Sequence, residues 1–178
     1  MLFHRHTLYQ GPPAERMSCV IGDLNNDGRP EIVISTRNPE QLHWFGRTTN
    51  GIWQQYLIDD TFPSISVGGA LVDLTGSGQL DLIAGTSDRG SHVYWWECPA
   101  NPTERWIRRE VSQLPGNRTH DLLLADIDGD GRPELYVWNQ DAETLFWVPL
   151  PDDPYSSPWL DFRPVVTGIN EQALAAAD

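Results

Sequence analysis

Short apolar runs separated by turn-forming residues fill most of the chain. Runs such as 31–36, 81–86 and 134–139 are rich in β-branched and aromatic residues, which is typical of β-strands. The pattern predicts twelve strands in three successive groups of four. Their ranges are 18–21, 31–36, 41–45, 52–58, 67–72, 81–86, 92–97, 106–111, 121–125, 134–139, 144–148 and 162–166. The chain is therefore predicted to be an all-β protein.

An acidic stretch of nine residues recurs along this pattern, each time between the first and second strand of a group. Residues 126–134 read DIDGDGRPE, residues 23–31 share the same skeleton, and residues 73–81 form a weaker copy. The three stretches begin at 23, 73 and 126. A period near fifty residues indicates a repeat architecture, in which each group of four strands is one unit.

The chemistry of the stretch indicates a divalent cation. Asp126, Asp128 and Asp130 alternate with other residues, so their carboxylates can converge in a tight loop, and Gly131 can supply a turn with positive φ. Oxygen-rich clusters of this kind suit Ca²⁺, which takes six to eight oxygen ligands. The closing acid, Glu134, is at position 9 and a strand follows. An EF-hand would instead have its closing acid at position 12 and continue as a helix.

Residues 22–34 and 125–137 resemble FG-GAP/VCBS repeats, the calcium-loop blades of integrin-α-like β-propellers, and the resemblance covers essentially the whole chain. In that family, side chains at loop positions 1, 3, 5 and 9 and the carbonyl at position 7 bind Ca²⁺. The ligands that the resemblance implies are Asp23, Asn25, Asp27, the Arg29 carbonyl and Glu31 in loop one, and Asp126, Asp128, Asp130, the Arg132 carbonyl and Glu134 in loop three.

Loop two departs from the family pattern. Thr75 and Ser77 stand where the other loops have acidic or amide side chains, so Asp73 and Asp81 are its only carboxylates. Ligand charge is a main determinant of Ca²⁺ affinity in such loops. We therefore expect the site in loop two to be weak or empty.

Each unit of four strands is expected to form one propeller blade. The blades should span about 15–60, 65–113 and 118–167. Residues 1–10 align with the last strand of a preceding blade. Residues 171–178 align with the first strand of a following blade, because the repeat outweighs the helical propensity of the alanines there.

Three blades do not close a ring, since propellers typically have four to eight. The sequence therefore predicts a partial, open propeller. We expect the chain to be a segment of a longer protein, and the alternative is that several copies complete a ring. The expected structural partners are accordingly the missing blades of a parent chain, or self-association.

Composition narrows the classes of partner. The formal net charge is −13, and two bound Ca²⁺ ions would still leave about −9, which argues against a nucleic acid partner. No run of 18 apolar residues predicts a membrane span, and the first residues lack the apolar region of a signal peptide. Cys19 and Cys98 lie in or beside apolar runs and are interpreted as small buried hydrophobes, with a disulfide as the alternative.

Tryptophans recur with the same period as the loops. Trp44, Trp95 and Trp147 lie 21 or 22 residues after their loop starts, and Trp53, Trp106 and Trp159 form a looser series. Sugar-stacking platforms are one interpretation, but a core between blades is favoured, because a core must recur in every unit. Trp96 is additional and points to the opposite face of its strand from Trp95. It is the better candidate for an exposed platform.

Two classes of function remain open. The first is a calcium-stabilised module that binds a protein or a glycan, with an extracellular or periplasmic location implied by the resemblance. The alternative is part of a carbohydrate-active enzyme, a polysaccharide lyase or sugar dehydratase, with His120 beside Asp121 as its candidate acid–base group. A lone histidine carries little weight, so a binding module is favoured over an enzyme.

Overall fold

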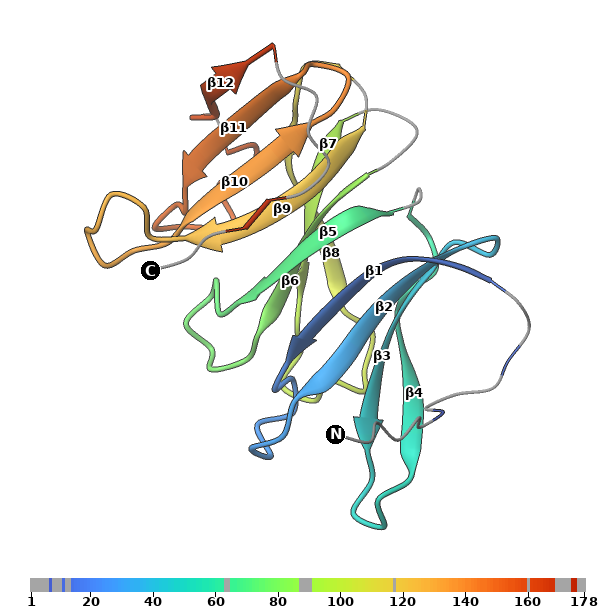
Figure 1. The fold of residues 1–178 in the computed structure, drawn as a ribbon. Helices are drawn as coiled ribbons and strands as arrows, with labels where there is room; N and C mark the ends of the chain where they lie inside the picture. Colours follow the sequence, from blue (N-terminus) through green and yellow to red (C-terminus); the bar gives the residue numbers. More distant parts are fainter. Residues whose placement is uncertain are drawn as a thin grey trace, which may run out of the picture.

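The computed structural model describes residues 7, 11, 14–62, 65–86, 91–116, 118–159, 161–168 and 174–175. Twelve strands within these residues form three four-stranded sheets, and in each sheet the strands pair antiparallel in sequence order. Figure 1 shows the three sheets side by side, like blades in an open fan. The sheets are called blades 1, 2 and 3 below.

The strands follow the predicted order in each blade. Blade 1 consists of β1 (Glu15–Gly22), β2 (Glu31–Arg37), β3 (Gln41–Arg47) and β4 (Trp53–Asp59). Blade 2 consists of β5 (Ile65–Val72), β6 (Asp81–Thr86), β7 (His92–Glu97) and β8 (Ile107–Gln113). Blade 3 consists of β9 (Thr119–Ala125), β10 (Glu134–Asn139), β11 (Thr144–Pro149) and β12 (Arg163–Thr167).

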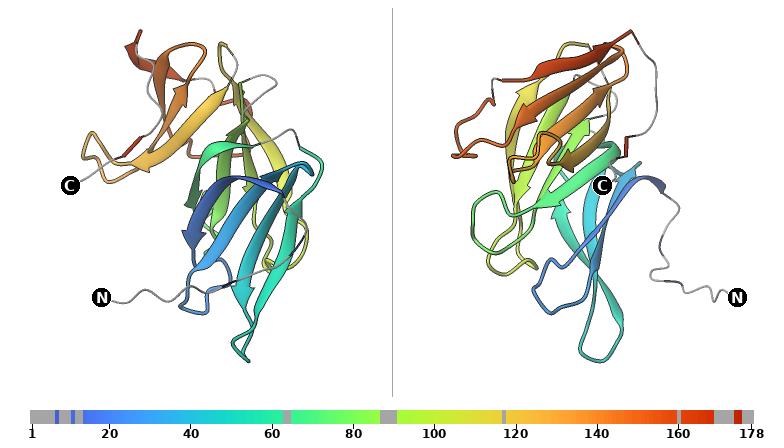
Figure 2. Two further views of the ribbon diagram at one scale, coloured as in Figure 1. Left: turned by 45° about the vertical axis from the view of Figure 1, so that its right-hand side comes forward. Right: turned by 60° about the vertical axis from the view of Figure 1, so that its left-hand side comes forward.

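The first strands of the blades are neighbours in space. Strand β1 packs beside β5, and β5 packs beside β9, so the blades radiate from a line of first strands, as the two views of Figure 2 show. None of the three sheets closes into a barrel. The predicted fold class, an all-β partial propeller, is confirmed.

The second strands of the blades differ in how completely they are buried. Strands β6 and β10 are buried at every position, and each begins with a carboxylate and continues with mainly apolar residues. In β2, by contrast, buried and half-buried residues alternate. Blade 2 packs between two neighbouring blades, so both faces of β6 are covered.

Two hydrophobic clusters fill the spaces between the blades. The first joins blades 1 and 2 and includes Val33, Leu42, Trp44, Leu82, Ala84 and Trp96. The second joins blades 2 and 3 and includes Ile83, Val93, Trp95, Leu135, Val137 and Val148. Burial of apolar area at ~25 cal/mol per Å² makes these two interfaces the main source of stability.

The structure confirms the predicted burial of two tryptophans and contradicts the predicted exposure of a third. Trp44 and Trp95 are buried in the clusters between blades, as predicted. The prediction that Trp96 is an exposed platform is wrong, because its side chain is fully buried. It does point to the opposite face from Trp95, but that face packs on blade 1, where the Trp96 indole Nε1 donates a hydrogen bond to Asp59 Oδ2 at 3.0 Å.

Both cysteines are free thiols. Cys98 is buried, as predicted, and burial raises the pKa of its thiol to about 12, with a further contribution from the nearby Asp81 carboxylate. The prediction that Cys19 is buried is wrong. Cys19 pairs with Ile34 across β1 and β2, on the face of blade 1 that points away from blade 2.

The two outer strand predictions lie mostly outside the described residues. Of residues 1–10, only residue 7 is described, and of residues 171–178 only Leu174 and Ala175 are. These two residues have no strand assignment, but the Leu174 N–H donates a hydrogen bond to Asp121 Oδ2 of β9 at 2.9 Å. Leu174 thus lies beside β9, and the strand identity of residues 171–178 stays a prediction.

Candidate metal centre

The three acidic loops share one backbone conformation. Each connects the first and second strand of its blade and has positive φ at positions 4 and 6. The residues concerned are Asn26, Gly28, Gly76, Gly78, Gly129 and Gly131, with φ between 56° and 88°. Glycine adopts this region without steric cost, and asparagine tolerates it better than most residues. The sequence therefore specifies the same turn three times.

The aspartate at position 1 holds each turn closed. Asp126 accepts hydrogen bonds from the N–H groups of Gly129 and Gly131 at 2.8 and 2.9 Å. Asp73 accepts from Ser77 and Gly78 at 3.0 and 2.8 Å. Asp23 does the same in loop one, with Asp27 and Gly28 as donors at 3.1 and 2.9 Å. Position 1 is thus a structural residue in all three loops as well as a candidate ligand.

The closing acid at position 9 makes a second recurring contact. Its carboxylate accepts the N–H of the residue at position 2. The distances are 2.9 Å from Leu24 to Glu31, 3.1 Å from Leu74 to Asp81 and 3.1 Å from Ile127 to Glu134. All three closing acids are buried, so this hydrogen bond anchors the loop to the base of the blade.

Loop three gathers four carboxylates at one point. Asp126, Asp128, Asp130 and Glu134 can each direct one oxygen so that all four oxygens lie within 4.8 Å of one another. The three aspartates are exposed and Glu134 is buried, so the group opens to solvent at its rim. The other predicted ligand, Arg132, directs its guanidinium away from the group, to Asp152 Oδ1 at 2.6 Å.

Loop one has an amide among its acids. The Asn25 Nδ2 lies 3.4 Å from Asp27 Oδ2 and 3.4 Å from Glu31 Oε1, while the Asn25 Oδ1 accepts the Asp27 N–H at 2.9 Å. The Arg29 N–H donates to Asp27 Oδ1 at 2.9 Å. Burial raises the pKa of the Glu31 carboxyl, and the charges of Asp27 and Asp23 raise it further. A cation bound there would oppose this shift, because it favours the charged carboxylate.

Loop two uses its polar groups within the protein. The Asp81 carboxylate accepts the Cys98 N–H at 2.8 Å as well as the Leu74 N–H, so both of its oxygens have partners. Ser77 Oγ accepts the Gln79 N–H at 3.2 Å. Burial raises the pKa of Asp81 to about 6. The loop is therefore complete as a hydrogen-bonded turn.

Sequence reasoning singled out the acids and missed two backbone features. One is the positive φ at position 4, which the residues Asn26, Gly76 and Gly129 share and which their types would have indicated. The other is the position 2 N–H that binds the closing acid, for which the side chains carry no signal, since every non-proline residue has such a donor.

The candidate acid–base pair is not joined by a hydrogen bond among those observed. Asp121 Oδ1 and Oδ2 accept the N–H groups of Leu122 and Leu174 at 3.0 and 2.9 Å. Among the described residues, the buried Nδ1 of His120 has no hydrogen-bond partner. Asp121 therefore acts as a backbone acceptor here, and it does not orient the imidazole as a catalytic partner would.

A comparison with protein families agrees with the repeat read from the sequence. The model of a family described as FG-GAP-like repeat matches twice, at residues 23–84 and 73–137, which together cover more than half of the chain. Each match begins at the first aspartate of an acidic loop and extends into the next unit. No curated protein matches the chain.

Proposed function

The chain belongs to the FG-GAP repeat family, and we propose that it is a calcium-stabilised propeller module that binds a protein or a glycan outside the cytoplasm. The observation that carries the calcium assignment is the convergence of the four carboxylates of loop three within 4.8 Å. Like charges held so close repel one another, and a divalent cation converts that repulsion into attraction.

The donor set favours Ca²⁺ over softer metals. All the side chains available in loop three are carboxylates, and hard oxygen donors without thiolate or imidazole suit Ca²⁺ or Mg²⁺. The ligand set combines three exposed aspartates with one buried glutamate, and Ca²⁺ accepts such an irregular set more readily than Mg²⁺, which requires a near-ideal octahedron. The ligands would be Asp126, Asp128, Asp130 and Glu134, with the Arg132 carbonyl.

A second ion would occupy loop one, which has the same backbone turn and the same contact to its closing acid. Its ligands would be Asp23, Asn25, Asp27, the Arg29 carbonyl and Glu31. Asn25 must present its Oδ1 to the ion, so its amide has to turn over, because its Nδ2 now faces Asp27 and Glu31. Loop one should accordingly bind more weakly than loop three.

The ion is assigned a structural role. It would fix the connection between the first two strands of a blade and so stabilise the blade by mass action, by ~2.7 kcal/mol per site at a free Ca²⁺ concentration 100 times Kd. Calcium sites of extracellular modules have dissociation constants of about 10⁻⁴–10⁻³ M, which exposed aspartates can provide. FG-GAP repeats are typically extracellular or periplasmic, which supports that location.

The binding role is supported by the placement of the loops. They follow the first strand of each blade, and the Asn26 Nδ2 of loop one donates a hydrogen bond to the Gly78 carbonyl of loop two at 3.0 Å. Neighbouring loops thus meet at one end of the fan, and loops on a rigid scaffold are the usual place for recognition. Within the part of the chain that is described, no helix is long and apolar enough to cross a membrane.

Calorimetric titration of the whole chain with Ca²⁺ tests the proposal. We expect about two sites per chain, because loops one and three have three and four carboxylates and loop two has two. Three sites of equal affinity, or no heat of binding at all, would contradict the assignment.

A further inference from the structure

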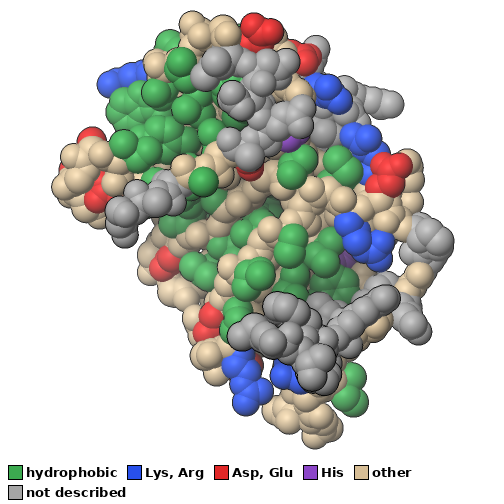
Figure 3. All heavy atoms as spheres, in the orientation of Figure 1, with side chains coloured by type: hydrophobic (Ala, Val, Ile, Leu, Met, Phe, Trp, Pro, Cys, Tyr) green, Lys and Arg blue, Asp and Glu red, His purple; other side chains and the backbone are tan. Residues whose placement is uncertain are grey.

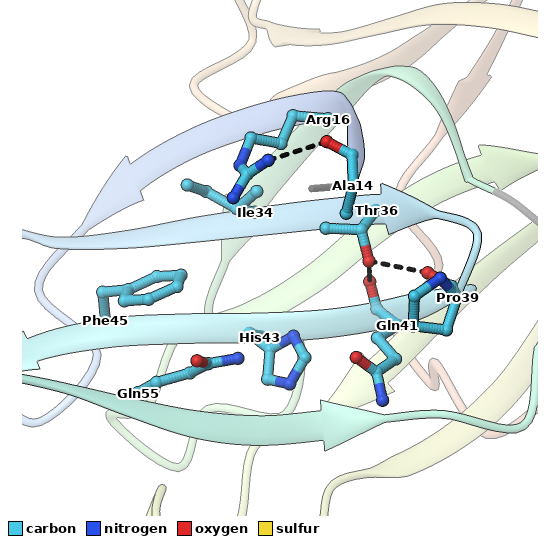
Figure 4. A pocket seen from close by; sticks show the side chains of 9 residues that line it. All are labelled: Ala14, Arg16, Ile34, Thr36, Pro39, Gln41, His43, Phe45 and Gln55. Atoms are coloured by element: carbon cyan, nitrogen blue, oxygen red, sulfur yellow. Dashed lines mark hydrogen bonds between the residues drawn. The ribbon is translucent and has the colours of Figure 1, made fainter. Parts of the chain in front are cut away.

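Two hollows lie on the outer faces of the fan. One, on blade 1, measures about 70 Å³, and Figure 4 shows Ile34, Phe45 and His43 among the side chains that line it. The other, on blade 3, measures about 350 Å³ and is lined in part by Leu174 and Ala175. Figure 3 shows hydrophobic side chains gathered over this blade. The first hollow is below the usual size of a ligand pocket, ~300–1,000 Å³, and the carboxylates in the second belong to the candidate metal centre.

A third hollow, called the loop hollow, lies between loop three and residues 150–162, which connect β11 to β12. Glu134, the first residue of β10, pairs with Ala125 and with Pro149, so both loops leave the same end of blade 3. The hollow measures about 440 Å³, which is within the range of small-molecule sites. The loop side chains that line it are Arg132 from loop three and Asp152, Ser156, Pro158, Trp159 and Asp161 from the longer loop.

The connection between the third and fourth strands differs in length from blade to blade. It spans residues 48–52 in blade 1, residues 98–106 in blade 2 and residues 150–162 in blade 3. In repeat proteins, insertions in single units lie in loops on one face, which is often the binding face. The additional length in blade 3 therefore makes this loop a candidate for recognition.

The shorter loop of blade 2 serves the packing between blades, and the longer loop does not repeat its contact. The Pro102 carbonyl of the shorter loop accepts the indole N–H of Trp44 in blade 1 at 3.0 Å. Trp95 is the counterpart of Trp44 in blade 2, and among the described residues its buried Nε1 has no hydrogen-bond partner. The Pro154 carbonyl of the longer loop instead accepts the indole N–H of Trp159, a residue of the same loop, at 3.2 Å. Packing between blades therefore does not account for the longer loop.

One side of the longer loop is fixed to blade 2. The backbone N–H of Trp159 donates to the Val111 carbonyl at 2.7 Å, and the Tyr155 hydroxyl donates to Glu97 Oε1 at 2.8 Å. Ser156 lies between these two anchors in the chain and lines the hollow. A ligand would thus meet a wall that is already ordered, which lowers the entropic cost of binding.

The charged groups at the rim of the loop hollow are paired one to one. The Arg132 guanidinium lies 2.6 Å from Asp152 Oδ1, and the Arg163 guanidinium pairs with Asp161. These four side chains are between 55% and 89% exposed. Exposed ion pairs contribute little to stability, so a ligand can replace part of either contact at little cost. Because the charges balance, the rim offers no net charge to an ionic ligand.

We propose that the loop hollow binds a neutral sugar ring of a glycan; this inference rests on the proposed binding function and names its ligand class and its site. A sugar hydroxyl both donates and accepts hydrogen bonds, so it can bridge the Arg132 guanidinium and the Asp152 carboxylate. The C–H groups of the ring would pack on Val148, Pro158 and Trp159, which line the hollow. Trp159 is 3% exposed, so it forms a fixed wall.

A protein ligand is the less favoured class for this hollow. Peptides are usually recognised along a sheet edge or an extended groove. The described lining of the loop hollow contains no residue of the outer strand β12. An anionic ligand is also disfavoured, because the chain has a formal net charge of −13 and like charges repel. A neutral ring that brings only hydroxyls avoids both difficulties.

The first test is binding of simple sugars to the full chain, measured by saturation-transfer NMR and calorimetry. The probes are the methyl glycosides of glucose, mannose and galactose at up to about 20 mM, which detects millimolar dissociation constants. At least one should bind, and the methyl uronide of the same ring should bind about tenfold more weakly, because its carboxylate faces Asp152 and Asp161. If none of the three binds, the glycan assignment is wrong. A uronide that binds equally well would overturn the assignment of a neutral ring.

Single substitutions then locate the site. Asp152→Asn and Asp161→Asn should each weaken binding about tenfold, as expected when a hydrogen bond to a charged group is lost. Asp60→Asn is the matched control, because it also removes an exposed carboxylate paired with an arginine, Arg105, but lies outside the hollow. The control should bind like the wild type. If it loses as much affinity as the other two variants, the assigned site is wrong.

Filling the hollow gives a larger effect. Ser156→Trp places a bulky side chain in the space that the ring would occupy, so binding should be lost while circular dichroism stays that of the wild type. Undiminished binding by a folded Ser156→Trp variant would contradict the site. Should this variant fail to fold, the two asparagine variants at exposed positions still decide the question.

Titrations with chelator and with Ca²⁺ separate this inference from the calcium assignment. Asp152, Ser156 and Asp161 lie outside the acidic loops, and Arg132 would use its carbonyl for the ion and its guanidinium for the sugar. Sugar binding is therefore expected under both conditions. Two calcium sites without sugar binding would overturn the glycan site and leave the calcium assignment standing. Sugar binding without any calcium site would support the glycan site and contradict the calcium assignment.

Discussion

Loops two and three have the same backbone and different charges. In both, the aspartate at position 1 closes the turn, glycines with positive φ stand at positions 4 and 6, and the position 2 N–H binds the closing acid. Loop three adds Asp128 and Asp130, where loop two has Thr75 and Ser77. Loop two shows that the turn forms without these two acids. In loop three, each of them accepts a backbone N–H with Oδ1, so the second carboxylate oxygen of each can face a cation.

The closing acids sharpen the contrast. In loop two, the shorter Asp81 gives its second oxygen to the Cys98 N–H. In loop three, Glu134 accepts the Ile127 N–H, and one of its oxygens belongs to the acidic group. One buried acid thus completes a hydrogen-bonded core, and the other faces a candidate metal site.

The largest effect expected from this difference between the loops is a pH-dependent loss of stability caused by ionisation of Asp81. Burial raises the pKa of Asp81 in the folded protein to about 6, above its ordinary value of 3.8 in the unfolded chain, so protonation of Asp81 favours folding. The resulting stability is present below about pH 4 and is lost as the pH rises through 6. Each pKa unit is worth about 1.4 kcal/mol, so the loss is on the order of 3 kcal/mol.

Denaturant unfolding at pH 4, 5, 6 and 7, with chelator present, checks this prediction. The free energy of unfolding of Asp81→Asn, relative to that of the wild type, should rise across this window, because the asparagine does not ionise. A constant difference would mean that the Asp81 carboxyl titrates normally and that its burial does not perturb it.

The second prediction is that adding two acids to loop two gives it the Ca²⁺ binding proposed for loop three. Thr75→Asp together with Ser77→Asp gives loop two four carboxylates on an unchanged backbone, so a third Ca²⁺ site should appear in calorimetry. Its contribution to stability should reach at most ~2.7 kcal/mol at a free Ca²⁺ concentration 100 times Kd. It should be weaker than loop three, because Asp81 remains committed to Cys98. Without Ca²⁺, the added charges should lower the melting temperature.

A smaller effect is expected in loop one. Asn25→Asp replaces the amide that now lies 3.4 Å from Asp27 and Glu31 with a fourth carboxylate. We expect Ca²⁺ affinity in loop one to rise about tenfold, which corresponds to about 1.4 kcal/mol. The change should appear as a shift of the weaker step in a calcium titration. If the stronger step shifts instead, loop one is the tighter site and loop three the weaker one, which reverses the proposed order of affinities.

The fold was predictable because the same pattern of strands and loop residues occurs in three successive units. Strand ranges such as 81–86 and 134–139 agree with β6 and β10 residue for residue. The unit also constrained the loops, since a glycine or asparagine at position 4 and a glycine at position 6 encode the turn. Local sequence determines these features, because they depend on φ preferences and side-chain type within one unit.

The errors arose where neighbouring units decide the outcome. Strand alternation correctly placed Trp96 opposite Trp95, but it does not say that blade 1 covers that side. Cys19 pairs with Ile34 as Leu122 pairs with Val137, but Leu122 is buried between blades 2 and 3, whereas no described blade covers Cys19. The orientation of Asp81 likewise depends on Cys98, at the end of β7 and seventeen residues away. The sequence of one repeat unit does not determine which other unit covers each of its faces or which distant residues it contacts.

The most direct test of the central claim compares Asp128→Ala in loop three with Ser77→Ala in loop two, positions 3 and 5 of the same backbone turn. The free energy of unfolding is measured for the wild type and both variants, with chelator and with Ca²⁺ at about 100 times Kd. Asp128→Ala should lose most of the stabilisation by Ca²⁺ that loop three provides, ~2.7 kcal/mol, and Ser77→Ala should lose almost none. Equal responses of the two variants to Ca²⁺ would contradict the assignment of the ion to loop three.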